Sequence, residues 1–179
     1  MAILVASVFA TPARAAVPSS QKELAAKVFD AHSTMEARWD AYHKFVMTNK
    51  KESIPMAKKA IKSQDWFLRE AGLKTLVALK PLEAKTVARN LFKNDPSMLV
   101  REQALSAIKI LGDKGCEEIL WQALNDRKNF RGDQSLWIRP KIVATLIEFK
   151  LGQKDQFQKL LDDRDKQVQR LAQIAIAKR

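Results

Sequence analysis

An arginine recurs along this sequence at nearly regular intervals. Arg38, Arg69, Arg101 and Arg139 are separated by 31, 32 and 38 residues, and Gln169 takes the corresponding position 30 residues after the last of them. A guanidinium group can form two parallel hydrogen bonds with a carboxylate or a phosphate. The recurrence therefore indicates either a series of structural ion pairs or a row of phosphate-binding groups.

Two clusters of basic residues could bind an acidic partner. In the first, Glu52 is the one acidic residue among six lysines: Lys44, Lys50, Lys51, Lys58, Lys59 and Lys62. In the second, Asp133 is the one acidic residue among Arg127, Lys128, Arg131, Arg139 and Lys141, and Phe130 lies within the cluster. A solvated face is the ordinary role of lysine, but arginine beside an aromatic ring is also typical of binding interfaces. We take Arg127, Lys128, Phe130, Arg131 and Lys141 as candidate partner-binding residues.

The sequence contains no recognisable catalytic or metal-binding motif. A glycine-rich phosphate loop, an HExxH motif and a CxxC motif are absent. His32 and Glu36 have the spacing of metal ligands on a helix, but Ser33 to Glu36 resembles a capping box that begins a helix, which places His32 in a turn. Cys116 is the single cysteine and is interpreted as a small buried residue. We expect no catalytic residue, no metal and no cofactor.

The arginines must be positioned by helices, and the stretch from Asp95 to Gly112 shows how. Asp95 and Pro96 suit the start of a helix, with Asp95 as its cap. The apolar residues that follow recur at steps of three and four, which is one face of a helix: Val100, Ala104, Ala107, Ile108 and Leu111. Gly112 is expected to end the helix in the left-handed conformation.

The other copies repeat this pattern in phase. We call the four recurring arginines and Gln169 the markers. Three positions after each marker stand Ala41, Gly72, Ala104, Ile142 and Ala172, and seven after it stand Phe45, Leu76, Ile108, Leu146 and Ile176. An amphipathic segment precedes every marked helix. We therefore expect five helical hairpins between Lys22 and Arg179, with close helix packing at the third position. Each hairpin should bury its apolar face against the next, and the polar last copy should cap the stack.

The apolar-Arg-x-x-Ala pattern after an aspartate-containing turn resembles the HEAT-like (PBS-lyase-type) helical repeat family. The resemblance implies an all-α fold, a right-handed α-solenoid of about five hairpins, and a non-enzymatic binding scaffold. It also implies a ladder in which each arginine pairs with an aspartate from the adjacent turn. The ladder residues would be Arg38, Asp65, Arg69, Asp95, Arg101, Arg139 and Asp163. Gln169 and the displaced Asp133 depart from the pattern, so the ladder should weaken towards the C-terminal end.

One spacing is longer than the others because of an insertion, residues 125–137. It carries Arg127, Lys128, Phe130 and Arg131, and no apolar run that could be buried. Nothing in the stacking of hairpins requires such an insertion, and surface loops tolerate neutral change. However, insertions in repeat proteins lie on one face, which is often the binding face.

The N-terminal residues predict export. Residues 2–10 are apolar apart from Ser7, and Ala13 to Ala15 has the small-x-small form that signal peptidases cut, although no basic residue precedes the apolar run. We predict a signal peptide at 1–15 with cleavage near Ala15, a linker at 16–21 and one repeat domain at 22–179. The apolar run is too short for a stable membrane span. The alternative is an apolar helix packed on the first repeat of a cytoplasmic protein.

The net charge of +12 and pI of about 9.9 favour acidic surfaces. The leading interpretation is a periplasmic or secreted scaffold that binds an acidic protein; the oligomeric state is left open. The alternative is a nucleic-acid-binding protein like the HEAT-like alkylpurine DNA glycosylases, although the Trp/Asp site of that family is not identified in this sequence. Four tryptophans could stack on bases, of which Trp121 is more simply a core residue: Trp39, Trp66, Trp121 and Trp137. Export discriminates between the two interpretations, because an exported protein does not normally meet the genome.

Overall fold

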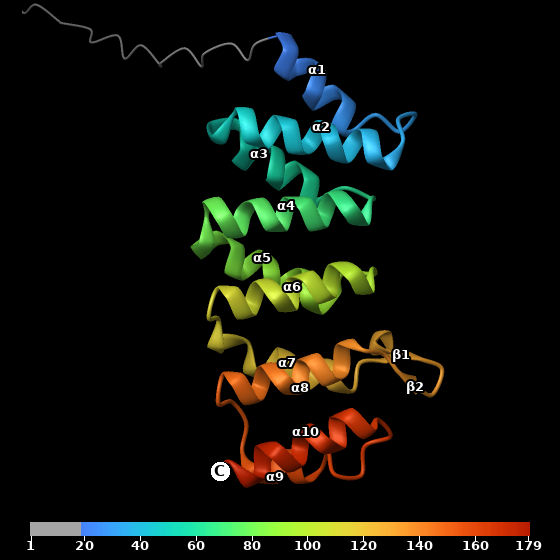
Figure 1. Ribbon diagram of the computed structural model, residues 1–179, viewed down its shortest axis with the longest axis vertical. Coiled ribbons are helices and arrows are strands. Elements are labelled where there is room, and N and C mark those ends of the chain that lie inside the picture. Colours follow the sequence, from blue (N-terminus) through green and yellow to red (C-terminus); the bar gives the residue numbers. More distant parts are fainter. Residues whose placement is uncertain (1–18) are drawn as a thin grey trace, which may run out of the picture. The chain divides into compact units, whose positions relative to one another are not determined.

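A computed structural model describes residues 19–179, which form an all-α fold (Figure 1). The α-helices are α1 (Ser19–Val28), α2 (Met35–Thr48), α3 (Lys50–Ile61), α4 (Trp66–Leu79), α5 (Pro81–Asn94), α6 (Met98–Ile110), α7 (Glu117–Leu124), α8 (Ile138–Glu148), α9 (Lys154–Gln158) and α10 (Lys166–Ala177). Short 3-10 turns lie at η1 (Lys114–Cys116) and η2 (Arg127–Asn129), and two-residue strands at β1 (Phe130–Arg131) and β2 (Gln134–Ser135). The predicted signal peptide and residues 16–18 lie outside the described residues. Helix α1 already begins at Ser19, within the range predicted as a linker.

The chain divides into two compact units, Met1–Phe45 and Val46–Arg179, and the structure describes the first of them from Ser19 onwards. The described part of the first unit buries one apolar side chain of α1, Val28, and three side chains of α2, Ala41, Tyr42 and Phe45. Thr34 caps α2 by accepting from the Ala37 amide, so the cap is one residue later than the predicted capping box, and the turn before it does contain His32.

The second unit is a solenoid-like stack of four hairpins, α3–α4, α5–α6, α7–α8 and α9–α10 (Figure 1). The second helices form one continuous row, since α6 contacts both α4 and α8, and α8 contacts α10. The first helices lie behind them, with α5 against α7. A shared core runs through the stack from Leu73 to Ala175.

The repeat positions that the sequence singles out are the positions at which these helices meet. All five residues at the third position after the markers are buried. Gly72 is the closest contact: a Cβ atom there would lie 2.6 Å from the Ala57 carbonyl oxygen of α3. Gly112 ends α6 with φ of +57°, as predicted. Ser97, not Asp95, is the N-cap residue of α6. The Asp95 carboxylate accepts hydrogen bonds from Arg69 and from the Ser97 amide instead.

Among residues 19–179, no helix is both long enough and apolar enough to cross a bilayer.

Candidate functional site

The insertion folds as a short turn followed by a β-hairpin. Asp126 begins it by accepting a hydrogen bond from the Lys128 amide, which starts η2. The strands pair Phe130 with Ser135, and Gly132 with φ of +60° makes the turn between them. The buried Asn129 holds the hairpin to α7, because its Nδ2 donates to the Ala123 carbonyl at 2.8 Å. The insertion is therefore anchored to the stack at its base.

Arg139 lies beneath this hairpin and is buried, with 2% of its surface exposed. Its guanidinium donates two hydrogen bonds to the Asp163 carboxylate, at 2.9 and 2.6 Å, and its Nε donates to the Leu124 carbonyl at 2.8 Å. The Phe130 ring covers the guanidinium at 4.4 Å from its centroid. Phe130, predicted as an anchor for a partner, is half-buried and packs on this arginine, and its contact with a partner stays a prediction.

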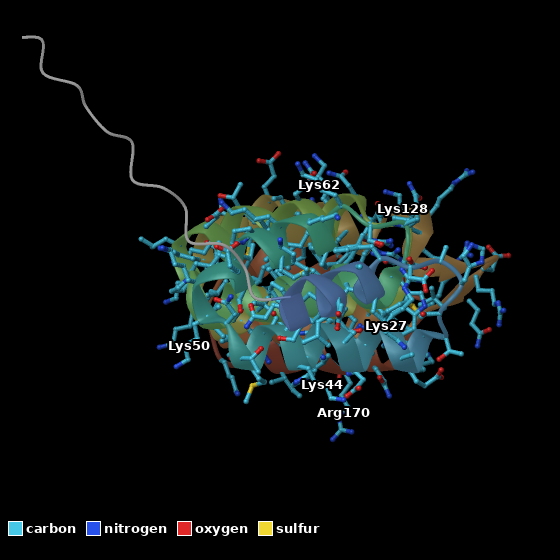
Figure 2. The ribbon with its side chains drawn as sticks, turned by 90° about the horizontal axis from the view of Figure 1, so that it is seen from above. Lys27, Lys44, Lys50, Lys62, Lys128 and Arg170 are labelled. Atoms are coloured by element: carbon cyan, nitrogen blue, oxygen red, sulfur yellow. The ribbon has the colours of Figure 1, made fainter. Side chains whose placement is uncertain are left out.

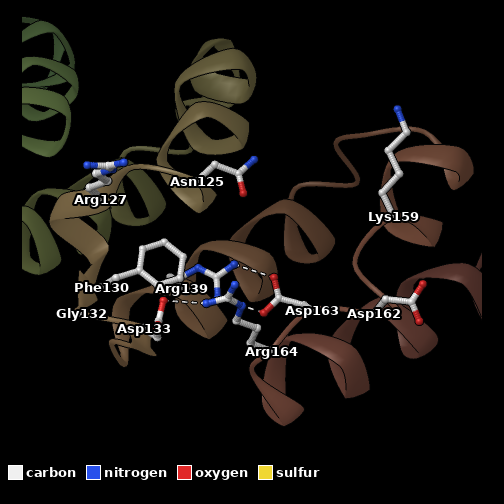
Figure 3. A pocket seen from close by; sticks show the side chains of 10 residues that line it. All are labelled: Asn125, Arg127, Phe130, Gly132, Asp133, Arg139, Lys159, Asp162, Asp163 and Arg164. Carbon is white, nitrogen blue, oxygen red and sulfur yellow. Dashed lines mark hydrogen bonds and ion pairs between the residues drawn. The ribbon is translucent and has the colours of Figure 1, made fainter.

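A pocket of about 710 Å³ opens between the hairpin and the connection from α9 to α10 (Figure 3). Its walls carry four cations and three carboxylates: Arg127, Arg139, Lys159, Arg164, Asp133, Asp162 and Asp163. Arg139 is neutralised by Asp163, and Arg164 by Asp133 at 2.8 Å. Within the described range, Arg127, Lys159 and Asp162 have no ion-pair partner. In Figure 3, Arg127 and Lys159 lie on opposite sides of the pocket, so its walls present two unpaired cations against the one unpaired carboxylate of Asp162, a net charge of +1.

The five candidate residues are not all brought together. Arg127 and Phe130 line the pocket. Lys128 turns towards α5, where its Nζ donates to the Lys93 carbonyl at 3.3 Å. Lys141 on α8 forms an ion pair with Glu102 of α6, which also accepts from the Trp137 indole. Arg131 is exposed and does not line the pocket.

The arginine ladder differs in its pairing from the sequence interpretation. Arg69 donates to both oxygens of Asp95, each at 2.7 Å, and Asp95 belongs to the next turn of the stack rather than to the turn before Arg69. Arg139 and Asp163 are paired in the same way, so the ladder is intact where it was expected to weaken. Gln169 ends it by donating to the Asp163 carbonyl at 2.6 Å. In the first unit, the Arg38 Nε donates to the Val28 carbonyl at 3.0 Å.

We call each arginine of the ladder, with the groups that accept its hydrogen bonds, a rung. The rung of Arg101, between those of Arg69 and Arg139, is the one of these three that lacks a carboxylate within residues 19–179. Arg101 donates to the carbonyls of Asp95 and Pro96, as Arg69 does to the carbonyls of its own turn. In the position that a carboxylate occupies for Arg69 and Arg139, however, Arg101 meets the Lys128 carbonyl and the Asn129 side-chain oxygen. No acidic side chain pairs directly with it among the described residues.

The pKa directions follow these contacts. The hydrogen bonds that Arg69 donates to Asp95 raise the pKa of Arg69 and outweigh the opposing effect of burial. Burial lowers the pKa of Arg101, and the more distant Asp126 and Asp95 only oppose this effect. Burial would raise the pKa of Asp163, but hydrogen bonds from Arg139 and from the Asp165 amide hold that pKa below its usual range.

Several residues were missed by sequence reasoning. Lys159, Asp162 and Arg164 enter the pocket from a connection that carries no repeat marker. Arg89 of α5 forms a second type of inter-repeat ion pair, with its Nε 2.6 Å from Asp113. Asp162 and Arg164 belong to a run of charged residues at 162–165, but such runs are too common to identify a site.

No group of three or more histidine, cysteine or acidic side chains among residues 19–179 could hold a metal ion. Cys116 is buried, and burial, reinforced by the nearby Asp113, raises its pKa to about 11, which keeps the thiol protonated.

The first lysine cluster behaves as a solvated surface. Lys58 of the second unit pairs with Glu83 at 2.6 Å with both side chains about half exposed. Figure 2 shows Lys62 and Lys128 on one side of the second unit and Arg170 on the opposite side. Basic residues therefore lie on opposite sides of the stack, and the pocket is distinguished from them by its shape.

Comparison with protein-family models, with curated proteins and with solved structures finds no significant match to this chain.

Proposed function

We propose that this protein is a non-enzymatic scaffold of the HEAT-like type, and that the pocket beside the insertion binds an acidic segment of a partner protein. One observation carries the proposal: a pocket of about 710 Å³ with unpaired Arg127 and Lys159 on its rim. Two cations across an open pocket attract an acidic segment and orient it between them.

The base of the pocket supports this role because it is fixed. Arg139 cannot rearrange without breaking its two hydrogen bonds to Asp163 and leaving a buried charge unpaired. The Phe130 ring packs over the Arg139 guanidinium. The rim residues Arg127 and Lys159 are exposed and have no such structural contact, so they are available to a ligand.

The test is fluorescence anisotropy with the full chain and a fluorescein-labelled peptide of eight glutamates. The matched peptide carries eight glutamines. We expect salt-dependent binding of the glutamate peptide alone, and Arg127→Glu combined with Lys159→Glu should weaken it roughly tenfold. Arg170→Glu makes the same kind of charge change at an exposed residue of α10 outside the pocket, and it should leave the affinity within about twofold.

Three results would count against the pocket. Equal binding of the glutamate and glutamine peptides would contradict the proposal that the partner is acidic. If Arg170→Glu weakened binding as much as Arg127→Glu combined with Lys159→Glu does, overall charge and not the pocket would attract the peptide. Tighter binding of a 20-base-pair DNA duplex, weakened by the same variants, would favour the nucleic-acid alternative.

We further propose that the protein is exported, which rests on the sequence of residues 1–15 alone. Mass spectrometry of the protein made in its native host should find an N-terminus within two residues of Ala16. An intact Met1 in a cytoplasmic fraction would contradict export.

A further inference from the structure

Arg101 is a buried cation without a carboxylate. It is 3% exposed, and its four hydrogen bonds all go to neutral oxygens: the carbonyls of Asp95, Pro96 and Lys128 and the side chain of Asn129. Its Nε is one of two buried side-chain polar atoms that have no hydrogen-bond partner within residues 19–179. A guanidinium so far from water should have a counter-charge.

The missing charge is local to this rung. Asn129 stands where Asp95 and Asp163 stand for the neighbouring arginines. Asp95 is already bound by both of its oxygens to Arg69. Asp126 lies at the edge of the site, where it caps the Lys128 amide and is 3.8 Å from the Lys128 ammonium group.

A cavity of about 60 Å³ adjoins this rung, and Arg101, Asn129, Lys93, Asp126, Ile119 and Ala123 are among the residues that line it. Its volume equals that of roughly two water molecules in the liquid. It shares no lining residue with the pocket beside the insertion. The walls combine the buried cation and Lys93 with a single carboxylate, so the cavity is positively charged overall.

We infer that this cavity binds one small monovalent anion, of the size of chloride or formate, which supplies the negative charge that the Arg101 rung lacks. A water molecule in the cavity would leave the buried charge uncompensated. The volume admits such an ion but not the whole of a bulky one. The anion would also stabilise the insertion, because the same guanidinium holds Lys128 and Asn129 of η2.

The experiment compares thermal and urea unfolding of the full chain in chloride, formate and gluconate at one ionic strength. Gluconate is too large for the cavity, and constant ionic strength removes general screening of the basic surface. A site with a dissociation constant of about 10 mM lowers the unfolding equilibrium constant about 11-fold at about 100 mM anion. We expect a reduction of that order in chloride and in formate, relative to gluconate. Excess broadening of the chloride-35 NMR line should report the bound ion directly, and formate should remove it.

Two variants test the location. Asn129→Asp supplies the carboxylate from the chain itself, and Ala123→Val narrows the cavity without a change of charge. Both should lose the difference between chloride and gluconate and the NMR broadening. Stability itself is not the criterion for Asn129→Asp, since an aspartate there would no longer donate to the Ala123 carbonyl.

The control is Asn90→Asp, which makes the same charge change at an exposed position of α5 and can still accept from Asn94. It should keep the full anion response. The inference is overturned if the wild type unfolds identically in the three salts, or if Asn90→Asp loses the response as completely as Asn129→Asp does.

Discussion

Replacing Gly72 by alanine should destabilise the protein, although the same change in most helices stabilises it. Gly72 lies inside α4, where a glycine ordinarily costs about 1 kcal/mol relative to alanine. Here the space is already filled. A Cβ atom would lie 2.6 Å from the Ala57 carbonyl oxygen, 2.8 Å from Ile61 Cγ1 and 3.0 Å from the Ile61 amide nitrogen.

Two of these three atoms belong to the backbone of α3, so the clash cannot be relieved by a rotamer change. Helix α3 would have to move away from α4, which opens the packing of the whole hairpin. Overpacking of this kind costs about 1–3 kcal/mol. For a chain of this size, each kcal/mol lowers Tm by about 2–4 °C.

Urea unfolding followed by circular dichroism measures this directly. The control is Ala78→Gly, which removes a methyl group from an exposed position of the same helix and reports helix propensity alone. We expect Gly72→Ala to lower the free energy of unfolding by up to about 2 kcal/mol, because the overpacking cost exceeds the gain of about 1 kcal/mol in helix propensity that Ala78→Gly measures in reverse. A stabilised Gly72→Ala protein would refute the register of the α3–α4 hairpin.

Three further outcomes are expected. Asp95→Asn removes the charge that pairs with the buried Arg69 and should cost about 3 kcal/mol in urea unfolding, while Asp162→Asn, an exposed control, should stay within about 0.5 kcal/mol. The folded-state pKa of Asp163 is lowered, so its contribution to stability is complete above about pH 4 and is lost as the pH falls further; the acid-induced loss of stability should be smaller in Asp163→Asn. Because burial raises the Cys116 pKa to about 11, iodoacetamide at pH 8 should modify this thiol in urea but not in the folded protein, as mass spectrometry would show.

The helices and their buried faces could be predicted because they depend on local periodicity. Ala104 and Ile108 are four residues apart on one face of the helix, and both are fully buried. Gly112 ends its helix with the positive φ that favours glycine. These features need only the geometry of one helix, which the spacing of apolar residues expresses directly.

The partners of the arginines could not be predicted in the same way. The acceptor of Arg69 lies 26 residues later, whereas Asp65, four residues before it, is the nearer candidate in sequence. Spacing within one repeat does not say which neighbouring turn a long side chain reaches. The Lys159 side of the pocket was missed for the same reason, since it meets the insertion only after α8 and α10 have packed.

The insertion has a structural role in the arginine ladder. Stacked hairpins do not require an insertion, but two of its residues contact arginines of the ladder. Asn129 accepts from Arg101, and Phe130 covers Arg139. Deleting the insertion would leave both guanidinium groups with fewer contacts in the protein interior, so neutral drift in a tolerant loop does not explain its sequence. Arg127 is the insertion residue on the pocket rim that none of these structural contacts uses, which is why the binding test begins with it.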